Sequence, residues 1–284
     1  RHLGLIPANE AQAAQEHIRA IGARIAQGVD LDRLLDLTAT AAFPPLPAHL
    51  ERRVPQRPVR IGVAQDAAFG FYYPGDLEAL GAAGARLVPI NTLRDARLPE
   101  IDGLFIGGGF PESFAAQLEA NASLRADIRK AIDAGLPVYA ECGGLMYLAR
   151  SLTWHGETRR MVGAIPGDVV MQTKPVGRGY VHLKPTAAHP WIGAAVPADD
   201  VRCHEFHYSS LENLPPDTRF AYRVVRGHGI DGRNDGVVHR NVLASYSHLR
   251  ATAGHDWAER FVAFVRCCAR QEDCRALEEL AVPA

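Results

Sequence analysis

A cysteine stands where an apolar stretch meets two glycines, and this segment is the one best suited to chemistry. Residues 136–140 are followed by Glu141, Cys142, Gly143 and Gly144, after which a helix-like segment begins. This order is typical of a nucleophile elbow, a sharp strand-to-helix turn with small neighbours and one side chain presented at its tip. A nearby helix N-terminus also favours the thiolate. On this pattern alone, a buried cysteine at the end of a core strand explains Cys142 as well as a nucleophile does.

A cluster of three glycines, Gly107, Gly108 and Gly109, follows a second apolar stretch at 104–106. Bare backbone at the end of a strand can point N–H groups at a developing oxyanion. A phosphate-binding loop would need Lys followed by Ser or Thr, whereas residues 110–112 are Phe, Pro and Glu. The glycines also lack the spacing of a dinucleotide-binding fingerprint. An ordinary tight turn is the remaining interpretation.

A histidine near the end of the chain is the candidate partner of the cysteine. His248 follows the apolar segment 242–245. A thiol nucleophile needs a nearby imidazole, first as the partner of an ion pair and then as the acid for the leaving group. By itself His248 is one of twelve histidines, for which a structural role is the usual one. In company with Cys142 and the glycine cluster it becomes the best candidate base, because such groups meet in space whatever their order in the chain.

These segments resemble class I glutamine amidotransferases, and more closely the glutaminase half of the cobyrinic acid a,c-diamide synthase family. The family's Gly-Gly-Gly-Tyr/Phe-Pro-Glu loop is matched at 107–112 and its Glu-Cys-Gly-Gly elbow at 141–144. Its Ala-Ser-Tyr-x-His segment is matched at 244–248, and its His-Glu-Phe-His-Tyr-Ser element at 204–209. The resemblance runs from about residue 58 to about residue 250, and four separated motifs in the right order make it specific.

The resemblance implies both a mechanism and partners. Cys142 would attack the side-chain amide of glutamine, and backbone N–H groups of Gly109 and Gly143, with Gly108 beside them, would hold the oxyanion and the substrate. His248 would protonate the departing ammonia. The ammonia would pass to a synthetase domain, where ATP and Mg²⁺ activate tetrapyrrole carboxylates for amidation. No cofactor is expected in this chain itself, since neither a P-loop nor a Walker-type acidic strand is found in it.

The chain departs from the wider class at the third member of the catalytic triad. Most class I amidotransferases have Glu two residues beyond the catalytic histidine, and here that position is Arg250. Glu205, within the His-Glu-Phe-His element, is the candidate for orienting His248. A Cys–His dyad is equally compatible with the sequence. If Glu205 is the third member, its carboxylate should reach the ring nitrogen of His248 that faces away from Cys142.

Composition is that of a compact cytoplasmic enzyme domain. The chain has 284 residues, of which 47% are hydrophobic and 22% charged, with a net charge of −1, so nucleic-acid binding is not indicated. No apolar run is long enough to cross a membrane. Five cysteines form no paired framework, as expected in a reducing compartment. The close set Cys203, His204, Glu205 and His207 is not expected to bind zinc, because strand alternation points His204 away from the others. A homodimer is compatible with these features.

The pattern of apolar residues predicts an α/β fold with two parts. Residues 1–57 are assigned to the end of the synthetase half, a helical segment at 10–40 and a proline-rich linker. Residues 58–284 are assigned to the glutaminase domain. There, strands alternate with helices up to about residue 152, which predicts a doubly wound, mostly parallel sheet of flavodoxin-like type. Residues 161–250 are more strand-rich, and a helix is expected from about 256 to 280.

Two questions stay open at this level. The tetrapyrrole could be cobyrinic or hydrogenobyrinic acid, the default for the family, or sirohaem or a sirohydrochlorin, which relatives in the same family amidate. A second class of function is a non-catalytic domain that binds a tetrapyrrole or a partner and keeps the fold for docking. Reaction of Cys142 with an electrophilic glutamine analogue would discriminate between these classes.

Overall fold

The computed structural model describes residues 11–39, 58–191, 201–252 and 255–270. The chain divides into two compact units, residues 1–53 and 54–284, and each is considered by itself. The first contains two helices, α1 (Ala11–Gly28) and α2 (Leu31–Ala39), within the segment predicted to be helical. Both expose large apolar side chains, among them Ile18 and Leu35, each 65% exposed.

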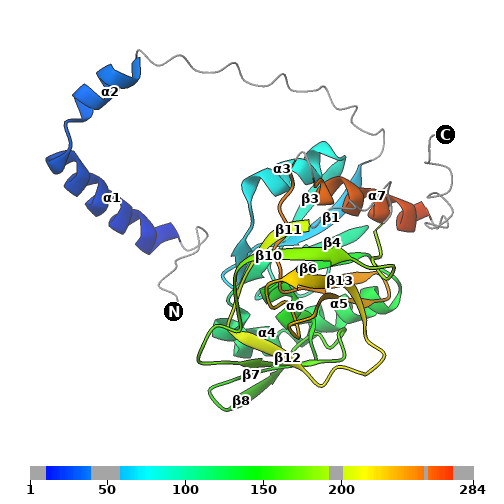
Figure 1. Cartoon of the computed structure of the whole chain (residues 1–284). Helices are drawn as coiled ribbons and strands as arrows, with labels where there is room; N and C mark the ends of the chain where they lie inside the picture. The colour runs from blue at the N-terminus through cyan, green and yellow to red at the C-terminus, as the bar shows by residue number, and fades with distance from the viewer. Residues whose placement is uncertain (1–10, 40–57, 192–200, 253–254, 271–284) are drawn as a thin grey trace, which may run out of the picture. The chain divides into compact units, whose positions relative to one another are not determined.

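The second unit is built on a nine-stranded mixed sheet (Figure 1). Its strands, in chain order, are β1 (Val59–Ala64), β3 (Ala85–Ile90), β4 (Gly103–Ile106), β6 (Val138–Glu141), β10 (Gly177–Pro185), β11 (Val201–His207), β13 (Arg219–Arg226), β14 (Asn234–His239) and β15 (Val242–Ser245). Their order across the sheet is β11-β10-β13-β14-β15-β6-β4-β1-β3.

The half of the sheet from β15 to β3 is parallel, and the other half is antiparallel. In chain order the five parallel strands lie in the sequence 2-1-3-4-5, which is the order of the flavodoxin-like doubly wound fold. The predicted fold class and the strand-rich C-terminal part are therefore confirmed. Ligands of such sheets bind beyond the carboxyl ends of the parallel strands. The glycine cluster, Cys142 and His248 follow β4, β6 and β15 at that edge.

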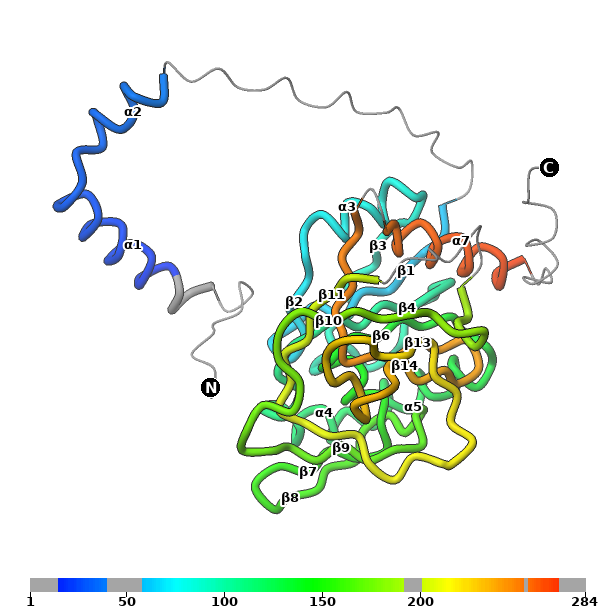
Figure 2. The backbone as a smooth tube through the Cα atoms, viewed as in Figure 1, coloured from blue at the N-terminus to red at the C-terminus, as the bar shows by residue number. Residues whose placement is uncertain are grey.

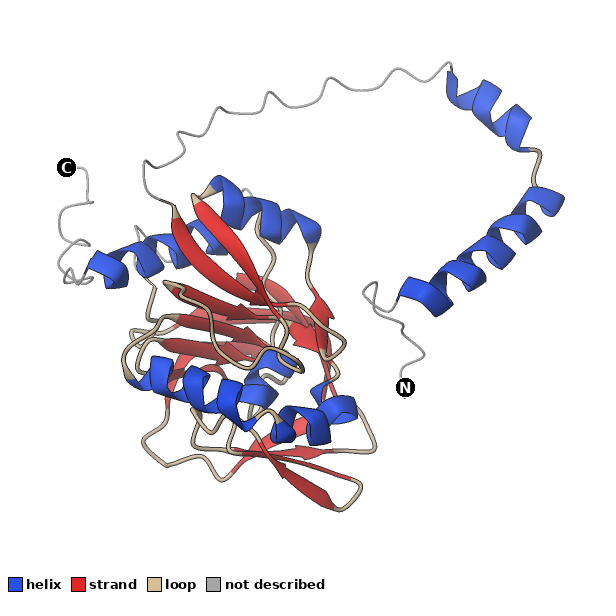
Figure 3. Ribbon diagram, turned by 180° about the vertical axis from the view of Figure 1, so that it is seen from behind, coloured by secondary structure: helices blue, strands red, loops and turns tan. Residues whose placement is uncertain are grey.

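Helices cover both faces of the parallel half, as the view from behind also shows (Figure 3). The helices in the described part of this unit are α3 (Pro74–Ala82), the 3₁₀ helix η1 (Pro111–Phe114), α4 (Ala115–Ala120), α5 (Ala122–Asp133), α6 (Gly143–Leu148) and α7 (Trp257–Arg270). Alternation along β4 and β6 separates the two cores. Ile106 and Ala140 lie in the core with α5 and α6, whereas Phe105 and Tyr139 lie in the core with α3 and α7.

Two small sheets flank the large one (Figure 2). The first has the order β12-β9-β7-β8, and the second pairs β2 with β5. Their strands are β2 (Phe69–Phe71), β5 (Gly108–Gly109), β7 (Ser151–Trp154), β8 (Glu157–Arg160), β9 (Asp168–Met171) and β12 (Ser209–Glu212). Strand β2 lies in the segment that follows β1, and its pairing with β5 holds the glycine cluster in position.

Some predicted helices differ from the observed ones. Residues 111–133 form the successive helices η1, α4 and α5, and the break comes at Asn121, whose side chain caps α5 by accepting a hydrogen bond from the N–H of Leu124. The helix after the elbow ends at Leu148, because the chain enters β7 three residues later. Helix α7 is described to Arg270, and the remainder of the expected helix lies outside the described residues.

None of the described helices combines the length and the apolar character needed to span a membrane. The side chains of Cys142, Cys203 and Cys268 are thiols. Cys267, on the buried side of α7, is disulfide-bonded, so the expectation that no cysteines pair was wrong.

Candidate active site

Cys142 occupies a sharp turn between β6 and α6. Its backbone has φ 48° and ψ −99°, a conformation that residues other than glycine rarely adopt. The turn is tight because α6 packs directly on β4. A Cβ atom at Gly144 would collide with the carbonyl oxygen of Ile106, so only glycine fits there. This geometry is that of a nucleophile elbow, with the mostly buried Cys142 side chain at the tip.

His248 is brought to Cys142 by the chain that leaves β15. Its backbone forms an antiparallel bridge with His204 on β11, which fixes the position of the residue. Burial lowers the pKa of His248, but a hydrogen bond with Cys142 and the nearby Glu141 carboxylate outweigh it, and the pKa lies above its usual value. The contacts with Cys142 and Glu141 therefore favour the imidazolium form of His248.

Glu141, the residue before the cysteine, provides the carboxylate beside His248. Its Oε2 lies 3.3 Å from Nδ1 of His248, and its side chain is buried. Its Oε1 accepts hydrogen bonds from the hydroxyl of Tyr139 at 2.5 Å and from the N–H of Leu249 at 2.9 Å. Burial raises the pKa of Tyr139, which therefore keeps its proton to donate. Glu141 is thus held by two donors in a position to orient the imidazole.

Glu205 does not occupy the place expected for it. Its carboxylate accepts hydrogen bonds from the N–H groups of His228 and Gly229 at 2.7 and 2.8 Å, and it lies 3.5 Å from Nε2 of His207. The expected contact with His248 is therefore wrong. The physical reason is strand alternation, because Glu205 points into the sheet interior whereas its neighbour His204 faces His248. The same alternation confirms that His204 diverges from Cys203, Glu205 and His207.

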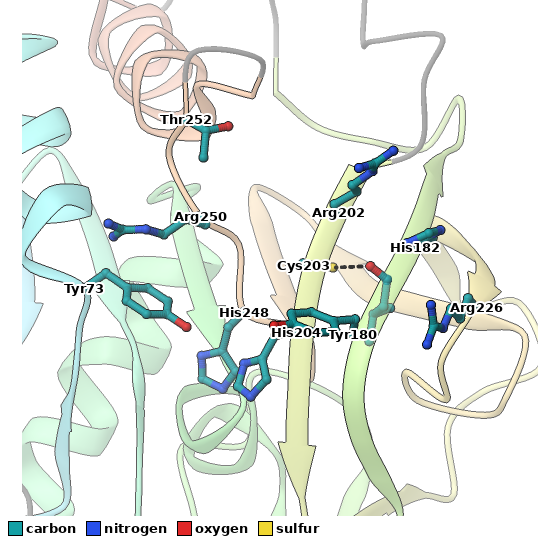
Figure 4. A pocket seen from close by; sticks show the side chains of 11 residues that line it. Tyr73, Tyr180, His182, Arg202, Cys203, His204, Arg226, His248, Arg250 and Thr252 are labelled. Atoms are coloured by element: carbon teal, nitrogen blue, oxygen red, sulfur yellow. Dashed lines mark hydrogen bonds between the residues drawn. The ribbon is translucent and has the colours of Figure 1, made fainter.

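Arg250 points away from Cys142 and His248 (Figure 4). It forms an ion pair with Asp76 of α3 at 3.1 Å, and its guanidinium lies over the ring of Tyr73, 4.6 Å from the ring centre. The carboxylate that lies beside His248 belongs to Glu141 on β6, whereas the wider class has a Glu two residues after the histidine. Both positions can reach the same histidine because β6 and β15 are adjacent parallel strands, with Glu141 opposite Ser245.

The glycines of the two loops meet beside Cys142. A Cβ atom at Gly143 would lie 2.9 Å from the backbone nitrogen of Gly109, so these two backbones are in contact. Gly143 is the first residue of α6, where N–H groups have no partner within the helix. Gly108 has a different neighbour, since a Cβ atom there would lie 2.7 Å from Cε1 of His248. The structure therefore brings Gly108, Gly109 and Gly143 together with Cys142 and His248.

Tyr72 and Asp66 hold the glycine loop, and the sequence reasoning missed both. The Tyr72 hydroxyl donates to the carbonyl of Ala64 at 2.5 Å and accepts from the N–H of Gly107 at 3.0 Å. Asp66 is buried and accepts hydrogen bonds from the N–H groups of Ala68 and Phe69 at the start of β2. These contacts fix β2, which in turn pairs with the glycine loop.

Glu141 was the other residue missed, although the sequence contained a signal for it. A carboxylate in the last position of a buried parallel strand needs donors, since an unpaired buried charge is costly. The residue also lies next to Cys142 in the sequence. In the described residues no group of three or more His, Cys, Asp or Glu side chains could hold a metal ion.

Comparison with known proteins agrees with this geometry. Residues 60–255 match the family model for the CobB/CobQ-like glutamine amidotransferase domain. The chain belongs to this family. Among curated relatives, cobyrinate a,c-diamide synthase of Magnetococcus marinus is 45% identical over 94% of this chain and 58% of its own length. The same enzyme of Methanosarcina barkeri is 39% identical over 94% of this chain and 58% of its own length. The amidotransferase chain thus spans little more than half of these relatives.

Solved structures support the fold of the amidotransferase domain. A protein of Thermoplasma acidophilum, assigned as a component of GMP synthase, superposes with a TM-score of 0.53 and 19% identity, covering 79% of this chain and 99% of that one. PurLQS from Thermotoga maritima superposes with a TM-score of 0.55 and 16% identity, covering 76% of this chain and 100% of that one. At these identities the likeness concerns the fold alone.

Proposed function

We propose that this chain is the glutaminase half of an ATP-dependent cobyrinate a,c-diamide synthase, in which Cys142 releases ammonia from glutamine. The main support for the proposal is that His248 contacts both Cys142 and Glu141 at the carboxyl edge of the sheet. The two glycine loops pack beside these residues. The curated relatives that bear the name cobyrinate a,c-diamide synthase favour this tetrapyrrole over sirohaem or a sirohydrochlorin.

In the first half of the reaction, the thiolate of Cys142 attacks the carbonyl carbon of the glutamine side-chain amide. The carbonyl oxygen becomes an oxyanion, and the N–H groups of Gly109 and Gly143 stabilise it. When the intermediate collapses, the C–N bond breaks, and the nitrogen takes a proton from Nε2 of His248 and leaves as ammonia. Each oxyanion donor of this kind contributes about 10²- to 10³-fold in rate.

In the second half, water hydrolyses the γ-glutamyl thioester. His248, now neutral, accepts a proton from the attacking water, and Cys142 leaves as a thiolate, which releases glutamate. Glu141 keeps the proton of His248 on Nδ1, so that Nε2 faces the cysteine in the tautomer that can accept a proton. Glu141 therefore takes the role that the sequence assigned to Glu205.

The other half of the reaction belongs to the part of the relatives that this chain does not span. There, ATP with Mg²⁺ would activate a carboxylate of the tetrapyrrole, and the ammonia would form the amide. The presence of a synthetase half is part of the proposal. So is the location of both halves in the cytoplasm. Residues 1–57 are assigned to the end of that half and to the linker.

The test is covalent labelling of the chain with a diazoketone analogue of glutamine, followed by mass spectrometry of the labelled peptide. We expect one label per chain, on Cys142, with glutamine protecting the site. Cys142→Ala should abolish labelling without changing the melting temperature. Cys268→Ala is the matched control, since this thiol lies on α7, away from the site, and its loss should leave labelling unchanged.

A second measurement tests the coupling to amidation. When the chain is combined with the synthetase half, Cys142→Ala should lose glutamine-dependent amidation and retain ammonia-dependent amidation. Failure of Cys142 to react in the folded wild-type chain would reject the catalytic function and favour a non-catalytic docking domain. Amidation of a sirohydrochlorin in preference to cobyrinate would correct the substrate.

A further inference from the structure

A pocket of about 600 Å³ lies beside His248, and its lining includes Arg202 and Arg226, two exposed arginines (Figure 4). Its volume is within the range of small-molecule sites, about 300 to 1,000 Å³. Its walls come from β10, β11, the end of β13 and the segment after β15. The lining residues are Tyr73, Tyr180, Val181, His182, Arg202, Cys203, His204, Arg226, His248, Arg250 and Thr252. Among the described residues, the lining thus contains three arginines and three histidines and no carboxylate.

Strand register explains how two arginines come to lie in one row with His182. His182 on β10 pairs with Arg202 on β11 and with Arg226 on β13. Arg202 and Arg226 therefore lie on either side of His182, in one row across the three strands. Neither Arg202 nor Arg226 forms an ion pair with a carboxylate of the described residues, and both are exposed. These two arginines are therefore available to bind an anionic ligand.

Strands β10, β11 and β13 as a whole are rich in basic residues. Strands β10, β11 and β13 carry six Lys and Arg residues and one acidic residue, Glu205, which is buried on the opposite side. The chain as a whole has a net charge of −1, so these three strands are much more basic than the chain as a whole. Arginine forms bidentate hydrogen bonds with carboxylates, which makes it suited to a ligand with several of them.

Aromatic surface completes the pocket. Tyr180 pairs with His204 in the row next to the cations, and its side chain is 76% exposed. Tyr73 points toward His248 from the other side of the pocket (Figure 4). The Nδ1 atom of His204 is buried without a hydrogen-bond partner among the described residues, which leaves one more polar group for a ligand. An exposed aromatic ring beside arginines suits a large ring system with carboxylates around its edge.

We propose that this pocket binds carboxylate groups of the tetrapyrrole substrate, with Arg202 and Arg226 holding the carboxylates and Tyr180 contacting the ring. The inference rests on the proposed function and extends it, because it gives the glutaminase half a direct part in substrate binding. The bound carboxylate edge would lie next to His248, the residue that protonates the departing ammonia. The two halves of the enzyme would then share one substrate site.

The test is a binding titration of the chain with cobyrinic acid, monitored by calorimetry. The same macrocycle with its carboxylates methylated is the ligand control. We expect the ester to bind at least about tenfold more weakly, since each charged hydrogen bond is worth roughly a factor of ten. The double variant Arg202→Ala with Arg226→Ala should lose about tenfold or more in affinity for the acid. Arg219→Ala, at the other end of β13, should bind as the wild type does.

The outcomes separate this inference from the proposed function. Labelling of Cys142 by the glutamine analogue is measured on the same samples, and the arginine variants should retain it, which also shows that they are folded. Equal affinity for acid and ester, or no effect of the double variant, would overturn the inference while normal labelling leaves the glutaminase function standing. Polyglutamate is the third probe. If it competes for the pocket as effectively as cobyrinic acid, the surface is a docking site for an acidic protein segment and the inference is rejected.

Discussion

Replacing Glu141 by glutamine should disable the site while leaving its shape in place. The carboxylate lies 3.3 Å from Nδ1 of His248, and at that separation an effective dielectric constant of about 20 corresponds to roughly 5 kcal/mol of attraction. The amide oxygen of the new side chain can still accept from Tyr139 and Leu249, but its NH₂ group then faces His248. Neutral His248 would have to turn its lone pair toward that NH₂ group, so Nε2 would carry the proton and could not accept one.

The expected consequence of Glu141→Gln is a loss of about 10³- to 10⁴-fold in the rate constant for reaction of Cys142. The pH profile should also change. The negative charge of Glu141 stabilises the imidazolium of His248, so removing it lowers the pKa of His248. The imidazolium then deprotonates at lower pH, and the alkaline limb of the profile should move down by about one to three pH units. The assay is the second-order rate of labelling by the glutamine analogue between about pH 5 and 10, which needs no synthetase half.

Glu205→Gln is the matched control. It makes the same chemical change at a buried carboxylate, but one that contacts His228, Gly229 and His207 instead of His248. It should lower the free energy of unfolding by about 1 to 3 kcal/mol and leave the pH profile of labelling unchanged. Labelling of Glu141→Gln within about threefold of wild type at every pH would refute the assignment of Glu141 as the orienting residue. So would a shifted alkaline limb in folded Glu205→Gln.

The remaining predictions concern the histidine and the two loops. His248→Ala should slow labelling of Cys142 by about 10³-fold or more, whereas His239→Ala, on β14, should change it little; the reverse would remove His248 from the site. Gly144→Ala should destabilise the fold by about 3 kcal/mol or more in urea unfolding, because the new Cβ would collide with the backbone of β4. Gly81→Ala, in α3 with no atom within 4 Å of the new Cβ, should stabilise it by about 0.5 to 1 kcal/mol, and equal effects would contradict the packing argument. Tyr72→Phe should cost about 1 kcal/mol and slow labelling severalfold, since the glycine loop loses its hydroxyl anchor; unchanged labelling would show that this anchor is dispensable.

The sequence by itself determined the parallel half of the sheet and the residues at its edge. Apolar stretches at 59–64, 104–106 and 138–140 coincide with strands, because buried strands of a parallel sheet read as continuous apolar runs. Cys142 and His248 could be brought together from the sequence for a related reason. Each follows such a strand, and the carboxyl ends of parallel strands meet at one edge.

Only the tertiary structure decided which carboxylate serves His248. Glu141 and Glu205 are both buried, and the sequence places Glu205 in the more suggestive motif. The choice depends on which face of its strand each side chain occupies and on which strand lies beside β15. Neither can be predicted from the local sequence. The row of Arg202, His182 and Arg226 has the same origin. These residues lie on three different strands and become neighbours through antiparallel register, which is set by long-range pairing.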